Sequence, residues 1–160
     1  MSKTTKVISR AALNFPIGTE LRSPSRRMTR ERMRWYVDLL PTVAEDDGFV
    51  HSGAGTIHDD DAYAISQGFP GIIADGMVST NWIAGLLFDA FGTDYLKKGK
   101  LRTKYIASIY EDQVVTCVAR VTFRNVLEDG STEYRFDVWC EDDTKAKMTV
   151  GEATVRCTAG

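Results

Sequence analysis

A single change of hydrophobic period constrains the fold of this chain more than any other feature. From Gly76 to Gly92 the apolar residues recur at helical spacing and occupy so much of the circumference that this helix should be largely buried. Four later segments instead alternate and are rich in β-branched and aromatic residues: 101–110, 113–126, 132–141 and 145–157. Short acidic connections, including the turn signal Asp129-Gly130, join these segments and indicate antiparallel neighbours. The sequence therefore predicts an α+β fold in which a curved antiparallel sheet wraps around one long helix.

The chain has the length of a single domain. Its 160 residues are 43% hydrophobic and 26% charged, which is ordinary for a globular protein. We expect an irregular N-terminal arm over residues 1–17, punctuated by Pro16 and Gly18, and one domain over residues 18–160. Thr29 can cap a helix that runs to about Leu40, and the acidic run 59–61 can start a second, short helix.

Composition excludes several classes of function. A net charge of -2 argues against a protein that coats nucleic acid. The longest apolar run, residues 82–88, is far too short to cross a bilayer, so no membrane association is expected. Residues 1–10 are cationic but are not followed by an apolar run of signal-peptide length, which favours a cytoplasmic protein.

The cysteines and histidines are too few and too scattered for a metal site. Three cysteines, Cys117, Cys140 and Cys157, all fall in strand-like contexts, where buried reduced thiols are more common than disulfides or ligands. With only two histidines and no closely spaced cysteine pair, neither a metal nor another cofactor is expected.

Charge is distributed unevenly along the chain. Residues 1–40 carry nine basic and three acidic side chains, whereas residues 41–75 carry seven acidic and no basic ones. Such an imbalance can mark a site or a partner surface. The basic segment includes arginines that could bind an anion or simply decorate a solvated helix: Arg26, Arg27, Arg30, Arg32 and Arg34.

Several short motifs together resemble the MaoC-like hydratase/dehydratases. They are Ile57-His58, Ala62, Gly68-Phe69, Ile73-Ala74-Asp75-Gly76-Met77 and Leu101-Arg102-Thr103-Lys104-Tyr105. The resemblance covers roughly residues 18–157 and implies a hotdog fold of the (R)-specific enoyl-CoA hydratase type. It also implies reversible addition of water to an acyl thioester, usually of coenzyme A, at a site on the interface of a homodimer or higher homo-oligomer.

One departure from the family signature affects the expected chemistry. The family carries Asp, any residue, Asn, Pro, an aliphatic residue and His, and its Asp and His form the acid/base pair. His58 and Ile57 match the last two positions, but Gly53 takes the place of the Asp. Imidazole titrates near neutrality and suits one proton transfer, so a second group must orient the water. The candidates are His51, the acidic run 59–61 and Asp75, which stands where many members of the family carry His.

Each of these candidates has a simpler explanation. Asp75 could cap the central helix, the run 59–61 could be a solvated helix start, and His51 could lie in a surface loop. The resemblance gives the backbone amide of Gly76 the role of oxyanion donor, and a helix N-terminus favours a developing negative charge. Arg102 and Lys104 alternate on one face of a strand and could bind coenzyme A phosphates, or could be ordinary solvent-facing cations.

The sequence supports a hydratase/dehydratase first and leaves other functions open. Loss of the carboxylate at Gly53 would suit a diverged hotdog enzyme that dehydrates, isomerises or cyclises a small molecule that is not a thioester. A non-catalytic acyl-binding module or a thioesterase would use the same fold, but that possibility depends on analogy of fold alone.

Overall fold

The computed structural model describes residues 14–38 and 56–158 of the chain. A six-stranded antiparallel sheet has the order β1-β4-β5-β6-β3, with the two-residue β2 also paired to β4. Its strands are β1 (Glu20–Arg22), β2 (Arg26–Arg27), β3 (Lys100–Tyr105), β4 (Val114–Val126), β5 (Thr132–Glu141) and β6 (Lys147–Cys157). The helices are α1 (Arg30–Asp38), α2 (Asp61–Ser66), α3 (Gly76–Phe91) and α4 (Thr93–Lys98).

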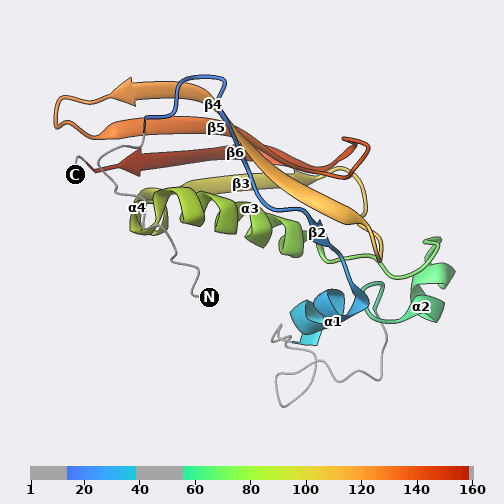
Figure 1. Ribbon diagram of the computed structural model, residues 1–160. Helices are drawn as coiled ribbons and strands as arrows, with labels where there is room; N and C mark the ends of the chain where they lie inside the picture. Colours follow the sequence, from blue (N-terminus) through green and yellow to red (C-terminus); the bar gives the residue numbers. More distant parts are fainter. Residues whose placement is uncertain (1–13, 39–55, 159–160) are drawn as a thin grey trace, which may run out of the picture.

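Helix α3 lies along one face of the sheet, and α1 and α2 lie beyond its N-terminal end (Figure 1). The Asp75 side chain caps the start of α3, and Gly92, with a φ of 57°, ends it where a residue with a Cβ would be strained. Six residues of α3 are buried: Val78, Ser79, Ile83, Leu86, Leu87 and Phe91. The predicted long helix and antiparallel strands are therefore confirmed.

An aromatic cluster joins the C-terminal end of α3 to the sheet. The Phe91 ring contacts Tyr134 and Phe136 of β5 at centroid distances of 5.7 and 5.5 Å. Phe15, which lies in the segment predicted to be an irregular arm, completes this cluster by meeting Phe91 edge-on at 5.7 Å. Stacked or edge-on aromatic pairs add to the stability gained from burying the rings.

The sequence did not predict three short elements, namely β1, β2 and α4.

The expectation of a largely buried α3 also needs correction, because Met77 and Phe88 on this helix are 44% and 43% exposed. Both side chains lie on a strip of α3 that the sheet does not cover. Of the helices in the described ranges, none is long and apolar enough to cross a membrane.

Candidate active site

His58 is held by backbone pairing between distant segments. The amide of Ile73 donates to the carbonyl of Ile57 at 3.0 Å, and the amide of Ala74 donates to the carbonyl of Ile109 at 2.8 Å. The segment before α3 therefore lies between the His58 turn and the strand-connecting residues near Ile109. Within the turn, the His58 amide donates to the Thr56 hydroxyl at 3.1 Å. This framework fixes the histidine backbone beside the N-terminus of α3.

One hydrogen bond determines the tautomer of His58. Its Nδ1 lies 2.9 Å from the carbonyl oxygen of Ile73. A carbonyl oxygen only accepts, so Nδ1 must carry the proton and donate. In the neutral ring, Nε2 then presents a free lone pair, which is the form that a general base requires.

Asp75 faces the free side of the His58 ring. Its Oδ2 lies 3.8 Å from Nε2, and each of the two side chains is 24% exposed. A separation of 3.8 Å exceeds a direct hydrogen bond but lets one water or hydroxyl oxygen lie within hydrogen-bonding distance of both atoms. The other carboxylate oxygen, Oδ1, accepts from the Met77 amide at 2.7 Å and caps α3. Capping and facing the histidine are thus compatible roles of one side chain.

A cavity of about 340 Å³ opens at this point. Its lining combines His58, Gly76 and aliphatic side chains with several hydroxyl groups: His58, Ile73, Ala74, Gly76, Ser79, Tyr105, Ile106, Ala107, Ser108, Ile109 and Thr149. The N-terminus of α3 contributes Gly76 to the wall, and the first amides of a helix have no acceptor within the helix. A negative charge developing in the cavity beside Gly76 would be stabilised by this amide and by the helix dipole.

Close packing also favours glycine at position 76. A Cβ at Gly76 would come within 2.7 Å of the Tyr105 ring. The Tyr105 hydroxyl lies 2.9 Å from the Thr80 hydroxyl and 3.2 Å from the Met77 sulfur, which fixes the ring over the first turn of α3. The backbone of Gly76 and the face of Tyr105 therefore form adjoining parts of one wall.

Comparison with solved structures identifies the fold. The (R)-hydratase from A. caviae involved in PHA biosynthesis is 20% identical and superposes with a TM-score of 0.64, covering 91% of this chain and 99% of its own. The MaoC-like dehydratase from Rhodospirillum rubrum is 12% identical, with a TM-score of 0.65 and coverage of 90% and 93%. The HadBC (3R-hydroxyacyl-ACP dehydratase) complex from Mycobacterium tuberculosis is 14% identical, with a TM-score of 0.61 and coverage of 88% and 95%.

This chain has the hotdog fold. The structural neighbours support the sequence resemblance to MaoC-like hydratases at the level of the fold. No protein-family model matches the sequence, and comparison with curated protein sequences gives no significant match. The function of this hotdog domain must therefore be argued from its own side chains.

A buried hydroxyl pair in the cavity of this hotdog domain was not predicted from the sequence. The Ser79 hydroxyl donates to the Gly76 carbonyl at 2.7 Å, so it must accept from the Thr149 hydroxyl, also at 2.7 Å. Ser79 is fully buried and Thr149 is 2% exposed. The sequence does place a serine three residues after Gly76 on an otherwise apolar helix, which indicates a buried hydroxyl. Its partner on β6 could not be predicted, because that pairing depends on the register of the sheet.

Helix α1 is joined to α2 and to the loop before β4 by one arginine. Arg30 donates to Glu111 from Nη2 at 2.6 Å and to Asp61 from Nη1 at 2.8 Å. These carboxylates, by hydrogen bonding first and by charge as well, raise the pKa of Arg30. Arg30 therefore ties α1 to α2 and to the loop before β4, and is not merely a solvated cation on the helix.

Tyr36 of α1 interacts with residues at the start of α3. Burial raises the pKa of its phenol, and the nearby Asp75 and Tyr105 add to that rise, while a hydrogen bond with the Asn81 side chain opposes it. Tyr36 consequently belongs to the same neighbourhood as Asp75.

The acidic run has local structural partners. Asp59 Oδ1 accepts from the Thr56 amide at 2.6 Å, and Asp60 Oδ1 accepts from the Tyr63 amide at 3.0 Å and caps α2. Asp61 Oδ1 accepts from the Ile72 amide at 3.1 Å. Hydrogen bonds from Arg30 and Ile72 lower the pKa of Asp61. Of the candidates in the described residues, Asp75 is the carboxylate that faces His58.

The other predicted site residues lie away from the cavity or outside the described ranges. Arg102 and Lys104 are exposed on β3, where they alternate with Thr103, whose hydroxyl meets Thr80 of α3 at 2.8 Å. They therefore point to the opposite face of the sheet from α3, and their binding role stays a prediction. His51, like Gly53, lies outside the described residues.

Proposed function

We propose that this protein is a hydratase/dehydratase that reversibly adds water to an enoyl thioester. The carrier would be coenzyme A or a related group. The single observation that carries the proposal is the placement of His58 Nε2 and Asp75 Oδ2, 3.8 Å apart, beside a cavity at the N-terminus of α3. Neighbours with this fold include an (R)-hydratase and a 3R-hydroxyacyl-ACP dehydratase, which agrees with the chemistry proposed here.

A water between the two side chains would be oriented for attack. Neutral His58 offers a lone pair at Nε2 and Asp75 offers a carboxylate oxygen, so both hydrogens of one water can be donated to them. The oxygen lone pair of that water is then free to attack the β-carbon of the enoyl group. Transfer of the water proton to His58 gives an imidazolium that the Asp75 charge stabilises.

The same proton can complete the reaction. The hydroxyl adds to the β-carbon, and the imidazolium of His58 returns its proton to the α-carbon, so the catalytic groups end in their starting states. Between these steps negative charge develops on the thioester carbonyl oxygen. We assign the Gly76 amide and the positive end of α3 to the stabilisation of that oxygen.

We also propose that the protein acts as a homodimer. Strand β3 is an edge of the sheet, and the neighbouring strip of α3 carries the exposed Met77 and Phe88. Exposed edge strands and apolar strips beside a cavity are normally covered in functional assemblies. A second copy would cover both at once and would also complete the cavity wall near Tyr105, whose side chain is half exposed.

The experiment is a hydration assay with paired variants. The protein is incubated with crotonyl-CoA and with longer and branched enoyl-CoA esters, and loss of enoyl absorbance is followed. His58→Asn is the sharpest variant, since the Asn amide can still donate to the Ile73 carbonyl while Nε2 is lost. We expect kcat to fall about 10²–10⁴-fold. Glu152→Gln, an exposed change on β6, serves as the matched control.

The alternatives give different results. Absence of turnover with every enoyl-CoA ester, from protein whose fold is verified by circular dichroism, would exclude the thioester reaction. If His58 remains essential for activity on some other small molecule, the diverged enzyme suggested by Gly53 is correct. Ligand binding without any turnover, unaffected by His58→Asn, would indicate a non-catalytic acyl-binding module.

A further inference from the structure

Two thiols face each other in the core, next to the cavity wall. Cys117 of β4 and Cys140 of β5 are directly opposite in the strand register, and their sulfurs are 3.0 Å apart. They are 1% and 0% exposed and both are free thiols. The proposed reaction uses neither of them.

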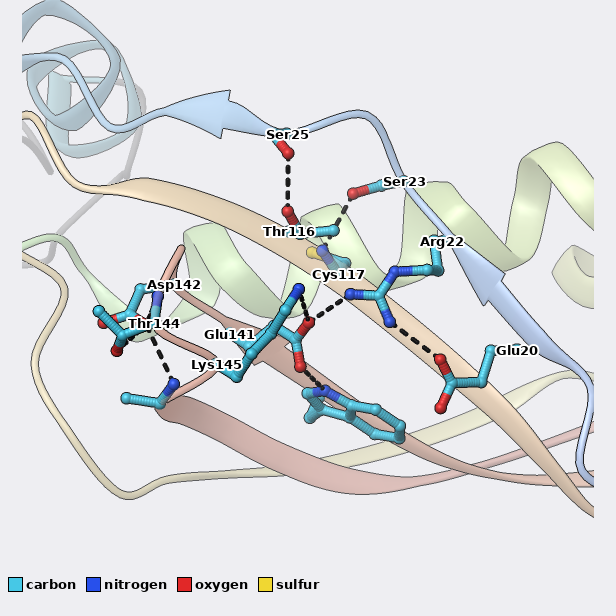
Figure 2. A network of polar contacts seen from close by, with 12 residues as sticks. Glu20, Arg22, Ser23, Ser25, Thr116, Cys117, Glu141, Asp142, Thr144 and Lys145 are labelled. Carbon is cyan, nitrogen blue, oxygen red and sulfur yellow. Dashed lines mark hydrogen bonds and ion pairs between the residues drawn. The ribbon is translucent and has the colours of Figure 1, made fainter.

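The backbone around Cys117 shows which kind of cross-strand pair this is. The Cys117 amide donates to the Ser23 hydroxyl at 3.0 Å, and the Cys117 carbonyl accepts from the Ser23 amide at 2.9 Å. Figure 2 shows Ser23 on the side of Cys117 away from β5. Both backbone groups of Cys117 thus point away from Cys140, which makes the two cysteines a non-hydrogen-bonded pair.

Such a pair already has the geometry of a disulfide. Opposite residues in non-hydrogen-bonded positions have Cα atoms about 4.5 Å apart, within the range of about 4.4–6.8 Å that disulfides span. Closing the bond requires the sulfurs to approach by about 1 Å, which side-chain rotation supplies without a change of strand register.

We propose that Cys117 and Cys140 form a reversible dithiol–disulfide site that a small oxidant, such as a peroxide, closes in the folded protein. With hydrogen peroxide, the thiolate of one cysteine attacks the O–O bond, which gives a sulfenic acid and releases hydroxide that is protonated to water. The second thiol then displaces the sulfenic oxygen as a second water, leaving the sulfur–sulfur bond. Two thiols are oxidised and one peroxide is reduced to two waters.

The surroundings assign the order of the two sulfurs. The hydrogen bond from the Cys140 thiol lowers the pKa of Cys117 against the opposing effect of burial, and the Arg26 charge lowers it further. The hydrogen bond to Cys117, together with burial, raises the pKa of Cys140. The proposal accordingly takes Cys117 as the attacking thiolate and Cys140 as the resolving thiol.

The pair is in contact with the cavity wall. Cys140 is opposite Thr149 in the β5–β6 register, and its sulfur lies 3.8 Å from the Ser79 carbonyl oxygen. Ser79 and Thr149 are the buried hydroxyl pair that lines the cavity. The Cys140 sulfur therefore lies one layer of side chains from the cavity, and the attacking Cys117 sulfur lies 3.0 Å beyond it.

Cys157 provides an internal reference. It is half-buried on β6 and is opposite Thr132 rather than another cysteine. Burial, with a further effect of the Asp94 charge, raises the pKa of Cys157 to about 11. A cysteine of this kind resists oxidation at neutral pH, and replacing it by serine leaves only the facing pair in the chain.

The test counts thiols in folded Cys157→Ser protein, and it does not depend on the proposed function. Samples treated with hydrogen peroxide, or with diamide, are quenched, denatured, alkylated with N-ethylmaleimide and weighed by mass spectrometry. We expect two alkylated cysteines before oxidation, none after it, a mass about 2 Da lower for the unlabelled chain, and full recovery with dithiothreitol.

Three results would overturn the proposal. The first is that two thiols stay alkylatable under conditions that oxidise the denatured chain. The second is an irreversible sulfinic acid as the peroxide product, and the third is a bond that joins two chains on a non-reducing gel. The doubly substituted Cys117→Ser, Cys157→Ser protein is the matched control, and it must give no intramolecular bond. The main experiment keeps both native cysteines of the pair. Its thiol count can therefore be interpreted even if the control protein folds poorly.

Discussion

The two carboxylate oxygens of Asp75 have different neighbours, and this separates its two possible roles. Oδ1 accepts from the Met77 amide at 2.7 Å, whereas Oδ2 lies 3.8 Å from His58 Nε2. Capping needs only an acceptor, which asparagine supplies as well as aspartate. Orienting and polarising a water beside an imidazolium needs the negative charge.

Asp75→Asn should therefore lower activity without unfolding the protein. If Asp75 is only a cap, both the free energy of unfolding and kcat will stay near their original values, because Asn and Asp cap helices equally well. If it pairs with His58, the free energy of unfolding changes by less than about 1 kcal/mol while kcat falls about 10²-fold or more. Urea unfolding measures the free energy of unfolding, and the hydration assay measures kcat. A loss of stability that accounts for the whole loss of activity would contradict the acid/base role.

Individual residues of the site could be predicted from the sequence, but which of them lie close together in space could not always be predicted. Asp75 and Gly76 are recognisable because they stand side by side at the start of an apolar helix. The approach of His58 to Asp75 depends on hydrogen bonds from Ile73 to Ile57 and from Ala74 to Ile109, which join segments far apart in the chain. No local pattern encodes such pairings, and the same is true of the Ser79–Thr149 hydroxyl pair.

At the scale of elements, the end of β5 is fixed by one buried carboxylate. Glu141 is 5% exposed and accepts from the Trp139 indole at 2.6 Å and from the Lys145 ammonium at 2.9 Å, and it also pairs with Arg22 of β1 (Figure 2). Burial alone would raise the pKa of Glu141, but these three hydrogen bonds outweigh it and lower the pKa to about 2. The network ties β1 and the β5–β6 turn to the outer face of the sheet.

Glu141→Gln should destabilise the fold by about 1–3 kcal/mol near neutral pH, because the amide loses a charged acceptor for two cations. A pKa lowered from the ordinary 4.5 to about 2 stabilises the folded state above pH 4.5, and that contribution disappears as the pH falls toward 2. The difference between the two proteins should therefore shrink between pH 5 and pH 2. Chemical unfolding at several pH values measures this difference in stability, with Glu152→Gln as control. A difference that is independent of pH would contradict the assigned role of the carboxylate.

The long elements were predictable from their period, whereas of the short ones only α2 was predicted, from the acidic residues at its start. Helix α3 has sixteen residues and β4 has thirteen, so the hydrophobic period repeats several times within each. Strand β1 has three residues and α4 has six, which is too few repeats to give a period. Strand β1 exists because β4 offers it an edge, with Leu21 opposite Ala119. Tertiary context therefore determines such elements more than local sequence does.

At the scale of the whole molecule, α3 has a second apolar strip in addition to the buried one. Met77 and Phe88 are eleven residues apart, three helical turns, and hence lie on the same side of the helix. The sequence suggested burial all round this helix, and within one chain the sheet covers only part of it. The dimer proposed above would reconcile the sequence pattern with the exposure of these two side chains.

Phe88→Glu should therefore weaken self-association and reduce activity together. A charge placed in a covered apolar interface must be desolvated, so we expect the dissociation constant to rise at least about tenfold, equivalent to about 1.4 kcal/mol. Sedimentation equilibrium over a range of concentrations measures it. Ile17→Glu is the matched control, because Ile17 is 65% exposed and precedes β1 at the opposite edge of the sheet. A wild-type protein that stays monomeric at all concentrations, or two variants that dissociate equally, would show that this strip of α3 is not where the copies meet.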